Sequence, residues 1–228
     1  MKKILALTLL MFIVGTGAFA LEWAVGGGGM FNYARTAKTW TYSDYTYGNF
    51  EDKDITTRQG FGAFAFLGLG RFWELNLGFM YKNPGTWEWD YALNGNIYDT
   101  DSIDISELNE LGGTMGLQFG AYFKFPLVMS NRLVLFPTIG MDFEVTIADT
   151  DEWWWNDLWV RAGAGLDIFF TDRLFLRGHF LYGVGIVTNG DSSLWWNVVD
   201  VLSSKYGYGT NDFISHGLLF KIGVGIMF

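Results

Sequence analysis

The most regular feature of the chain is an alternation of large apolar residues with small or polar ones. From Trp73 to Lys82 nearly every odd position is large and apolar, and the even positions are mostly polar or small. Successive side chains of a β-strand point to opposite faces, so this segment predicts a strand with one apolar face. The pattern recurs in seven further segments, namely 22–33, 59–70, 111–125, 133–145, 158–170, 174–186 and 213–228.

Two of these segments depart from the simple pattern. In segment 59–70 the large residues Phe61, Phe64, Phe66 and Leu67 fall on both faces, so the alternation does not assign a face to each of them. Pro137 lies inside segment 133–145 and cannot donate a hydrogen bond to a neighbouring strand. The alternation continues past it without a change of face, and the sequence offers no explanation for this proline.

The connections between the segments are alternately short and long. Short turns are expected near 71, 126–132 and 171–173, and long connections over 34–58, 83–110, 147–156 and 188–212. Membrane β-barrels of bacteria have short periplasmic turns and longer extracellular loops. We therefore expect an all-β, antiparallel up-and-down barrel of about eight strands, with both termini on the periplasmic side.

A soluble lipocalin-like barrel would also alternate, and the two faces distinguish it from a membrane barrel. The second face is rich in glycine, for example Gly120, Gly163 and Gly183, and glycine is a poor choice for a solvated strand surface. The apolar face carries no charged residue in most strands, as a lipid-facing surface requires, because a Lys or Arg at the bilayer midplane costs ~2–4 kcal/mol. Both observations favour a transmembrane barrel.

The N-terminus has the three parts of a secretory signal peptide. Lys2 and Lys3 precede a short apolar run and the small-residue site Ala18-Phe19-Ala20. The sequence predicts a cleavable signal peptide over 1–20 and a barrel domain over 21–228. The alternative is an uncleaved helical anchor, but the apolar run is shorter than the ~20 residues that cross a bilayer.

Composition narrows the possible functions. The formal net charge of −9 becomes −11 when Lys2 and Lys3 are removed, which argues against a nucleic-acid partner. The chain has no cysteine, so disulfides, thiolate nucleophiles and Cys-based metal sites are excluded. The mature chain lacks 18 consecutive apolar residues, so no transmembrane helix is expected.

The C-terminal residues resemble the assembly signal of bacterial outer-membrane barrels. The matching positions are Lys221, Gly223, Ile226 and the terminal Phe228. The resemblance implies insertion into the outer membrane of a diderm bacterium, with the insertion machinery and periplasmic chaperones as partners beside the membrane lipid. At the level of architecture, the chain resembles the small eight-stranded class that includes the OmpA transmembrane domain, OmpX and OmpW.

Pairing arithmetic predicts charge pairs inside the barrel. If connected strands pair symmetrically about their turns, Asp142 faces Arg161 (residue numbers summing to 303) and Asp167 faces Arg177 (344). Opposite charges across a strand pair stabilise a sheet, so we interpret these as structural pairs that fill the lumen. The alternative is an ion-selective constriction. Further inward charges are expected near the two pairs: Glu144 above, and Glu74 and Lys124 below.

The sequence offers no catalytic, cofactor or metal site. His179 is expected inside the barrel, and His216 lies in the lipid-facing register. Residues Asp99-Thr100-Asp101 resemble the start of a calcium loop, but Ile103 stands where a ligand is needed. We therefore expect a protein that is not an enzyme.

The outer loops combine tryptophans with acidic residues. The candidate contact residues for a host or surface ligand are Trp87, Trp89, Trp153, Trp154, Trp155, Trp195 and Trp196. Exposed aromatics are common binding anchors, although a hydrated rim would have the same composition. We expect a structural or adhesin-like surface role with a side-chain-filled lumen. The alternative is an OmpW-like conduit for small hydrophobic molecules, lined by Met80, Phe136, Phe175, Leu181 and Leu219.

Overall fold

The computed structural model describes residues 22–44, 48–83, 85–94, 96–104, 113–147, 156–188, 191–192 and 210–228. The strands are β1 (Trp23–Asp44), β2 (Gly48–Leu69), β3 (Trp73–Lys82), β4 (Thr86–Leu93), β5 (Asn96–Asp104), β6 (Thr114–Lys124), β7 (Leu127–Ser130), β8 (Leu133–Ile147), β9 (Asn156–Phe169), β10 (Leu174–Thr188), β11 (Asp191–Ser192) and β12 (Thr210–Met227). Within these residues, no helix is long and apolar enough to cross a membrane.

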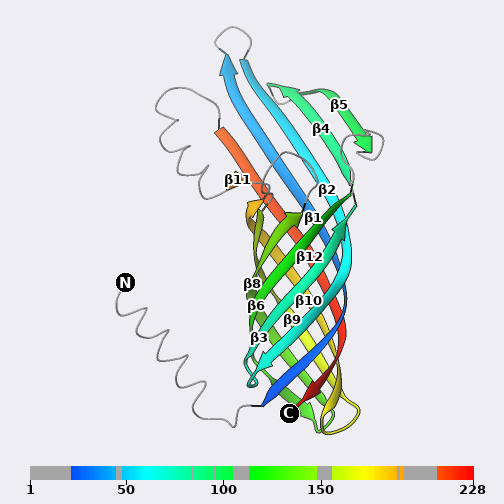
Figure 1. Ribbon diagram of the computed structural model, residues 1–228. Coiled ribbons are helices and arrows are strands. Elements are labelled where there is room, and N and C mark those ends of the chain that lie inside the picture. Colours follow the sequence, from blue (N-terminus) through cyan, green and yellow to red (C-terminus); the bar gives the residue numbers. More distant parts are fainter. Residues whose placement is uncertain are drawn as a thin grey trace, which may run out of the picture.

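Eight of the strands close into a ring. Antiparallel neighbours follow the order β1-β12-β10-β9-β8-β6-β3-β2, and pairing of β1 with β2 completes the circle (Figure 1). Closure leaves no unpaired strand edge in the barrel wall, which is how a sheet satisfies its backbone hydrogen bonds in lipid. The predicted all-β, up-and-down barrel of about eight strands is confirmed.

The outer surface of the ring of strands is apolar, and its interior contains polar and aromatic side chains. In β3, Glu74 and Asn76 are buried in the lumen whereas Leu75 and Leu77 are 44% and 52% exposed. All eight ring strands contribute exposed large apolar side chains, among them Phe31, Phe61, Leu77, Phe119, Met141, Ile168, Phe180 and Ile222. This inverts the arrangement of a soluble domain and provides a continuous apolar belt.

The structure assigns the faces that the alternation left open in β2. Phe64 and Phe66 are 5% and 4% exposed and point into the lumen, and Phe61 is 55% exposed on the outside. The two inward rings lie 6.1 Å apart between their centroids, and Phe66 lies 6.1 Å from Phe175 of β10. Aromatic side chains therefore project from both faces of this strand, into the lumen and toward the outside.

Pro137 lies where β8 changes its neighbour. Thr138 pairs with Lys124 at the end of β6, and Leu135 pairs with Leu127 at the start of β7. The carbonyl of Pro137 accepts a hydrogen bond from Phe125, in the gap between those two strands. The N–H and C=O of one residue point to the same neighbour in an antiparallel strand, so the missing donor falls at this gap, where Pro is tolerated.

The long connection expected over 34–58 is mostly strand, so that prediction was wrong. β1 and β2 continue past the ring as a hairpin whose pairing runs from Tyr33↔Gln59 to Asp44↔Gly48. The connection expected over 83–110 likewise contains β4, which pairs with the outer half of β2, and β5, which pairs with β4. We call the outer parts of β1, β2 and β12 together with β4 and β5 the outer extension; it rises above the ring in Figure 1.

Two other expected connections also contain short strands. The turn expected over 126–132 includes β7, which pairs with β8, and segment 188–212 includes β11, which pairs with β10. Two of the expected short turns hold: residues 70–72 join β2 to β3, and residues 170–173 join β9 to β10. Gly70 has a φ of 63°, which favours glycine in the first of these turns.

The first and last described residues of the barrel lie together at the end with the short turns. The amide of Phe228 donates to the carbonyl of Trp23 over 2.7 Å, which continues the β1–β12 pairing to the end of the chain. At the same end, Arg71 donates two hydrogen bonds of 3.0 Å to the carboxylate of Glu22. We call this end the turn end and the opposite one the outer end.

Candidate functional site in the barrel lumen

Glu74 is the centre of the lowest charge layer, nearest the turn end. Its side chain is fully buried and accepts hydrogen bonds from Lys124 Nζ at 2.9 Å, Arg177 Nη1 at 2.6 Å and Asn76 Nδ2 at 2.9 Å. Three strands, β3, β6 and β10, thus meet at one carboxylate. The Nε2 atom of His179 lies 3.5 Å from the same group.

The second anion of this layer is Asp167 of β9. It accepts two hydrogen bonds from Arg177, at 2.7 Å from Nε and 2.5 Å from Nη2, and the two residues stand directly opposite in the register. The guanidinium also lies against two aromatic rings, with its carbon 4.6 Å from the ring centroid of Phe66 and 4.7 Å from that of Phe175. A bidentate, aromatic-flanked arginine is held in one geometry, so this layer is a rigid plug.

A middle layer is built around Asp142 of β8. Its carboxylate accepts hydrogen bonds from Arg161 Nε at 2.5 Å and from the hydroxyl of Tyr122. Lys221 Nζ donates to the Tyr122 hydroxyl at 3.3 Å and lies 4.8 Å above its ring. These side chains come from β6, β8, β9 and β12, so the layer crosses the lumen.

The expected register of Asp142 and Arg161 was wrong by two residues. Asp142 pairs with Trp159, and Arg161 pairs with Gly140, so the charge pair is diagonal rather than directly opposite. The prediction assumed that the strands pair symmetrically about residues 151 and 152, whereas β8 continues two residues further than its pairing with β9. A diagonal neighbour is within reach of a long side chain such as arginine, so the two groups still meet.

The upper layer contains pairs that lie at the strand ends. Lys82 Nζ is 2.5 Å from Glu144 and 3.1 Å from Asp157, and Glu144 lies 3.7 Å from Arg161. The sequence predicted an inward Glu144 and placed Lys82 at the end of the strand 73–82, but it predicted no ion pair for Lys82 or Asp157. Their inward position was visible in the alternation, since Lys82 continues the parity of Glu74 and Met80.

Inward glycines provide the space for these large side chains. A Cβ on Gly183 would lie 2.9 Å from the Arg161 side chain, and one on Gly120 would lie 2.6 Å from the Asp142 carboxylate. A Cβ on Gly165 would enter the ring of Phe136. A narrow barrel thus fills its lumen by placing glycine opposite an aromatic or charged residue.

The apolar residues expected to line a conduit are packed instead. Met80, Phe136, Phe175, Leu181 and Leu219 are each 0–2% exposed. All but Phe136 belong to one buried cluster with Phe64, Phe66 and Tyr122.

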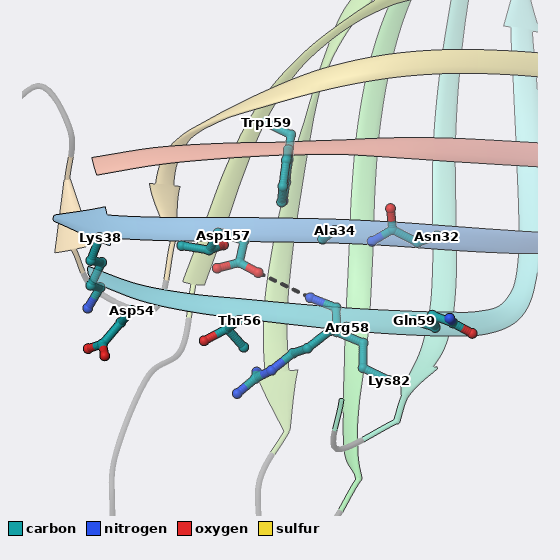
Figure 2. A pocket seen from close by; sticks show the side chains of 12 residues that line it. Asn32, Ala34, Lys38, Asp54, Thr56, Arg58, Gln59, Lys82, Asp157 and Trp159 are labelled. Atoms are coloured by element: carbon teal, nitrogen blue, oxygen red, sulfur yellow. Dashed lines mark hydrogen bonds and ion pairs between the residues drawn. The ribbon is translucent and has the colours of Figure 1, made fainter. Parts of the chain in front are cut away.

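Two cavities lie at the ends of the lumen. One of about 540 Å³ lies at the turn end, bordered by Arg71, Lys124 and Asp172. The other, of about 140 Å³, lies at the outer end between Asn32, Arg58, Lys82 and Trp159 (Figure 2). The charge layers and the buried cluster lie between the two cavities, so the described side chains close the axis of the barrel.

Only part of the tryptophan set lies in described residues. The indole Nε1 of Trp89 donates to Asp52 across the β2–β4 pair, and its ring stacks on Tyr91 with centroids 5.9 Å apart. The backbone of Trp87 is in β4, but its side chain lies outside the described residues, as do Trp153, Trp154, Trp155, Trp195 and Trp196. The loop-contact prediction therefore stays a prediction.

The structure brings the assembly-signal residues to both faces of β12. Lys221 and Gly223 are buried in the lumen, whereas Ile226 and Phe228 are 44% and 69% exposed on the outside.

His216 is also on the outer side and stacks on Tyr182 with centroids 6.4 Å apart. In the described part of the chain, no group of three or more acidic, His or Cys side chains could hold a metal. The side chains of Asp99 and Asp101 lie outside it.

The closed ring, the apolar outer belt and the charged interior define a small eight-stranded transmembrane-type β-barrel. No protein-family model matches the chain, and no curated protein matches it. The solved structures similar to it include Neisserial surface protein A (12% identity, TM-score 0.38, 88% of this chain and 99% of that one). Others are OprG of Pseudomonas aeruginosa (9%, 0.43, 93% and 98%) and the protease OmpT of Escherichia coli (6%, 0.37, 93% and 100%).

Proposed function

We propose that the chain is a non-enzymatic barrel of the bacterial outer membrane that holds a rigid extracellular sheet above a closed lumen, for a structural or adhesin-like role. The observation that carries this proposal is the contrast between the two ends. The apolar belt needs a lipid environment, since so large an exposed apolar surface is incompatible with water. Above it, β1 and β2 continue as a polar hairpin joined by β4 and β5.

The outer extension is suited to contact because its backbone is fixed before any partner arrives. A sheet that is already ordered loses little conformational entropy on binding, unlike a mobile loop. Trp89 and Tyr91 stack on its surface and Trp89 is anchored by Asp52, so an aromatic patch is held in place. Aromatic anchors of this kind often dominate protein interfaces.

The experiment compares adhesion of cells that display the full chain with cells that display a variant in which 86–104 is replaced by a short Gly-Ser turn. Because the replaced segment lies outside the ring, we expect equal amounts of folded barrel and a loss of binding to host cells or immobilised glycans. Trp89→Ala should lose part of the binding. Equal adhesion of all three proteins would contradict the surface role.

The alternative function is an OmpW-like conduit for small hydrophobic molecules. The apolar character of the inward-facing Leu181, Leu219 and Phe175 supports this alternative, because a conduit for hydrophobic molecules needs an apolar lining. Liposomes that contain the barrel provide the test. Uptake of small apolar solutes above the rate of empty liposomes would favour the conduit over the closed barrel.

We also propose that Phe228 directs assembly by the outer-membrane insertion machinery. Its ring is exposed at the end of β12, and its backbone completes the pairing with Trp23. Deletion of Phe228 should reduce the folded, protease-resistant fraction while export continues, and Val128→Ala at an exposed position of the turn end should not. Equal folded fractions with and without Phe228 would contradict this role.

A further inference from the structure

The cavity at the outer end is lined by polar atoms that lack hydrogen-bond partners. Three buried polar atoms on its wall have no hydrogen-bond partner: Nε of Arg58, Nε1 of Trp159 and Oδ1 of Asn32. Trp159 and Asn32 are each only 2% exposed. A buried donor or acceptor without a partner costs about 1–3 kcal/mol, so this wall gains stability from any molecule that pairs with it.

The charges around the cavity leave Arg58 without a counterion of its own. The lumen anions Glu74, Asp142, Glu144, Asp157 and Asp167 are matched in number by the cations Lys82, Lys124, Arg161, Arg177 and Lys221. Asp157 is the anion whose charge acts on Arg58. It is already paired with Lys82, whose Nζ lies 3.1 Å from its carboxylate, and Figure 2 marks this contact with a dashed line. On the other side of the cavity, Lys38 and Asp54 stand opposite each other in the β1–β2 register.

Arg58 lies beyond the exposed Phe61 in the outer half of β2, and its side chain is partly buried. A partly buried cation with an unused N–H needs an anionic oxygen acceptor, and the indole N–H of Trp159 needs an oxygen as well. Carboxylates match the planar fork of arginine better than spherical anions do. The cavity volume of about 140 Å³ restricts the ligand to a few non-hydrogen atoms.

We propose that the outer cavity is a binding site for a small carboxylate anion that enters from the outer end. Arg58 supplies the charge, Trp159 supplies a second donor, and Asn32 lies on the same wall. This inference is independent of the adhesin-like role, because the cavity lies inside the barrel at its outer end and not on the outer surface of the extension. It also differs from transport, since the charge layers below close the axis.

The test uses the full mature chain folded in detergent micelles and labelled with ¹⁵N at the tryptophan indoles. The Trp159 signal is assigned as the one lost in Trp159→Phe. Sodium acetate is titrated against sodium chloride at constant ionic strength, and acetamide serves as the uncharged analogue of acetate. We expect a saturable shift of the Trp159 signal with acetate and none with acetamide or chloride.

Variants separate the site from a general salt effect. Arg58→Gln should weaken acetate binding at least tenfold, whereas Arg132→Gln, an exposed cation at the turn end, should leave it unchanged. Asn32→Asp provides a second route, because it places a carboxylate in the cavity and should abolish the acetate shift. The proposal is overturned by a cavity that holds only water, seen as no saturable shift, by equal binding of acetamide, or by unchanged affinity in both cavity variants.

Discussion

The barrel wall and the outer extension are formed in part by the same strands but are stabilised differently. Below Tyr33 and Gln59, each residue of β1 and β2 faces either the apolar surroundings or the packed lumen. Above them, both faces carry polar residues such as Thr and Lys, most of them at intermediate exposure. The wall is therefore held by packing and buried charge, and the extension mainly by its backbone hydrogen bonds.

The difference shows that a strand can form without the alternating sequence pattern from which strands are predicted. Alternation arises only where two media lie on the two sides of a sheet, which is the condition in the wall. In the extension both sides are polar, yet the ladder continues because the hairpin register is already set by the wall. The energetic consequences of mutation should separate the two regions, and the following predictions run from the largest expected difference to the smallest.

Removal of one buried charge should be far more costly in the wall than in the extension. Glu74→Gln leaves Lys124 without its carboxylate partner, and breaking a buried pair typically costs about 3–5 kcal/mol. The matched change Asp54→Asn acts on a cross-strand pair in the extension and should cost less than ~1 kcal/mol. Urea unfolding in lipid vesicles measures both free energies, and equal losses would contradict the comparison.

Two glycines in adjacent strands test whether the wall has one packed face. Gly165→Ala should lower the free energy of unfolding by roughly 1–3 kcal/mol, because the new methyl group enters the Phe136 ring. Gly178→Ala adds the same group on the outside, where nothing lies within 4 Å of the new Cβ. We expect the second variant to unfold at the wild-type urea concentration. A destabilised Gly178→Ala would mean that the two faces are exchanged.

The two arginine–aspartate pairs should be energetically coupled. Double-mutant cycles that combine Asp142→Ala with Arg161→Ala, and Asp167→Ala with Arg177→Ala, should each give an interaction energy of at least ~0.5 kcal/mol. The bidentate Asp167–Arg177 pair should be the stronger of the two if its aromatic flanks fix the guanidinium. Additive effects at both pairs would show that the layers are not the contacts described above.

The smallest effect is expected at the turn end, where the ion pair is exposed. The hydrogen bonds from Arg71 hold the pKa of Glu22 below its ordinary value. The pair therefore stabilises the fold above the ordinary pKa of about 4.3, and this contribution is lost as pH falls through the lower folded pKa. Glu22→Gln should cost about 0.2–1 kcal/mol at pH 7 and nothing in strong acid. A cost that stays constant with pH would exclude this ion pair as its cause.

The sequence predicted the wall well because lipid and lumen impose opposite requirements on alternate residues. The pairing of Asp167 with Arg177 was also predictable, since the intervening turn is short and symmetrical. The pairing of Asp142 was displaced by two residues because the longer connection after β8 is not symmetrical. Register arguments are therefore reliable across tight turns and weak across long connections.

The extension and the outer cavity were missed for a physical reason. Segment 34–58 has no apolar face, so the period-two signal is absent even though its Thr, Tyr and Trp residues have high strand propensity. That propensity was the available signal. Arg58 was assigned to a connection because its neighbours lack alternation, whereas Lys82 lay in the predicted strand 73–82. The cavity that the two residues share depends on the continuation of β2 above the ring.

The central claim is that the side chains of the wall close the lumen, and conductance tests it most directly. Purified monomers reconstituted in planar lipid bilayers should give no large, steady conductance at any moderate voltage, because Glu74, Asp142 and the residues bonded to them fill the axis. Barrels of ~16 strands, which leave a water-filled channel, conduct steadily under the same conditions. A large and steady porin-like conductance from monomers of this chain would contradict the closed lumen.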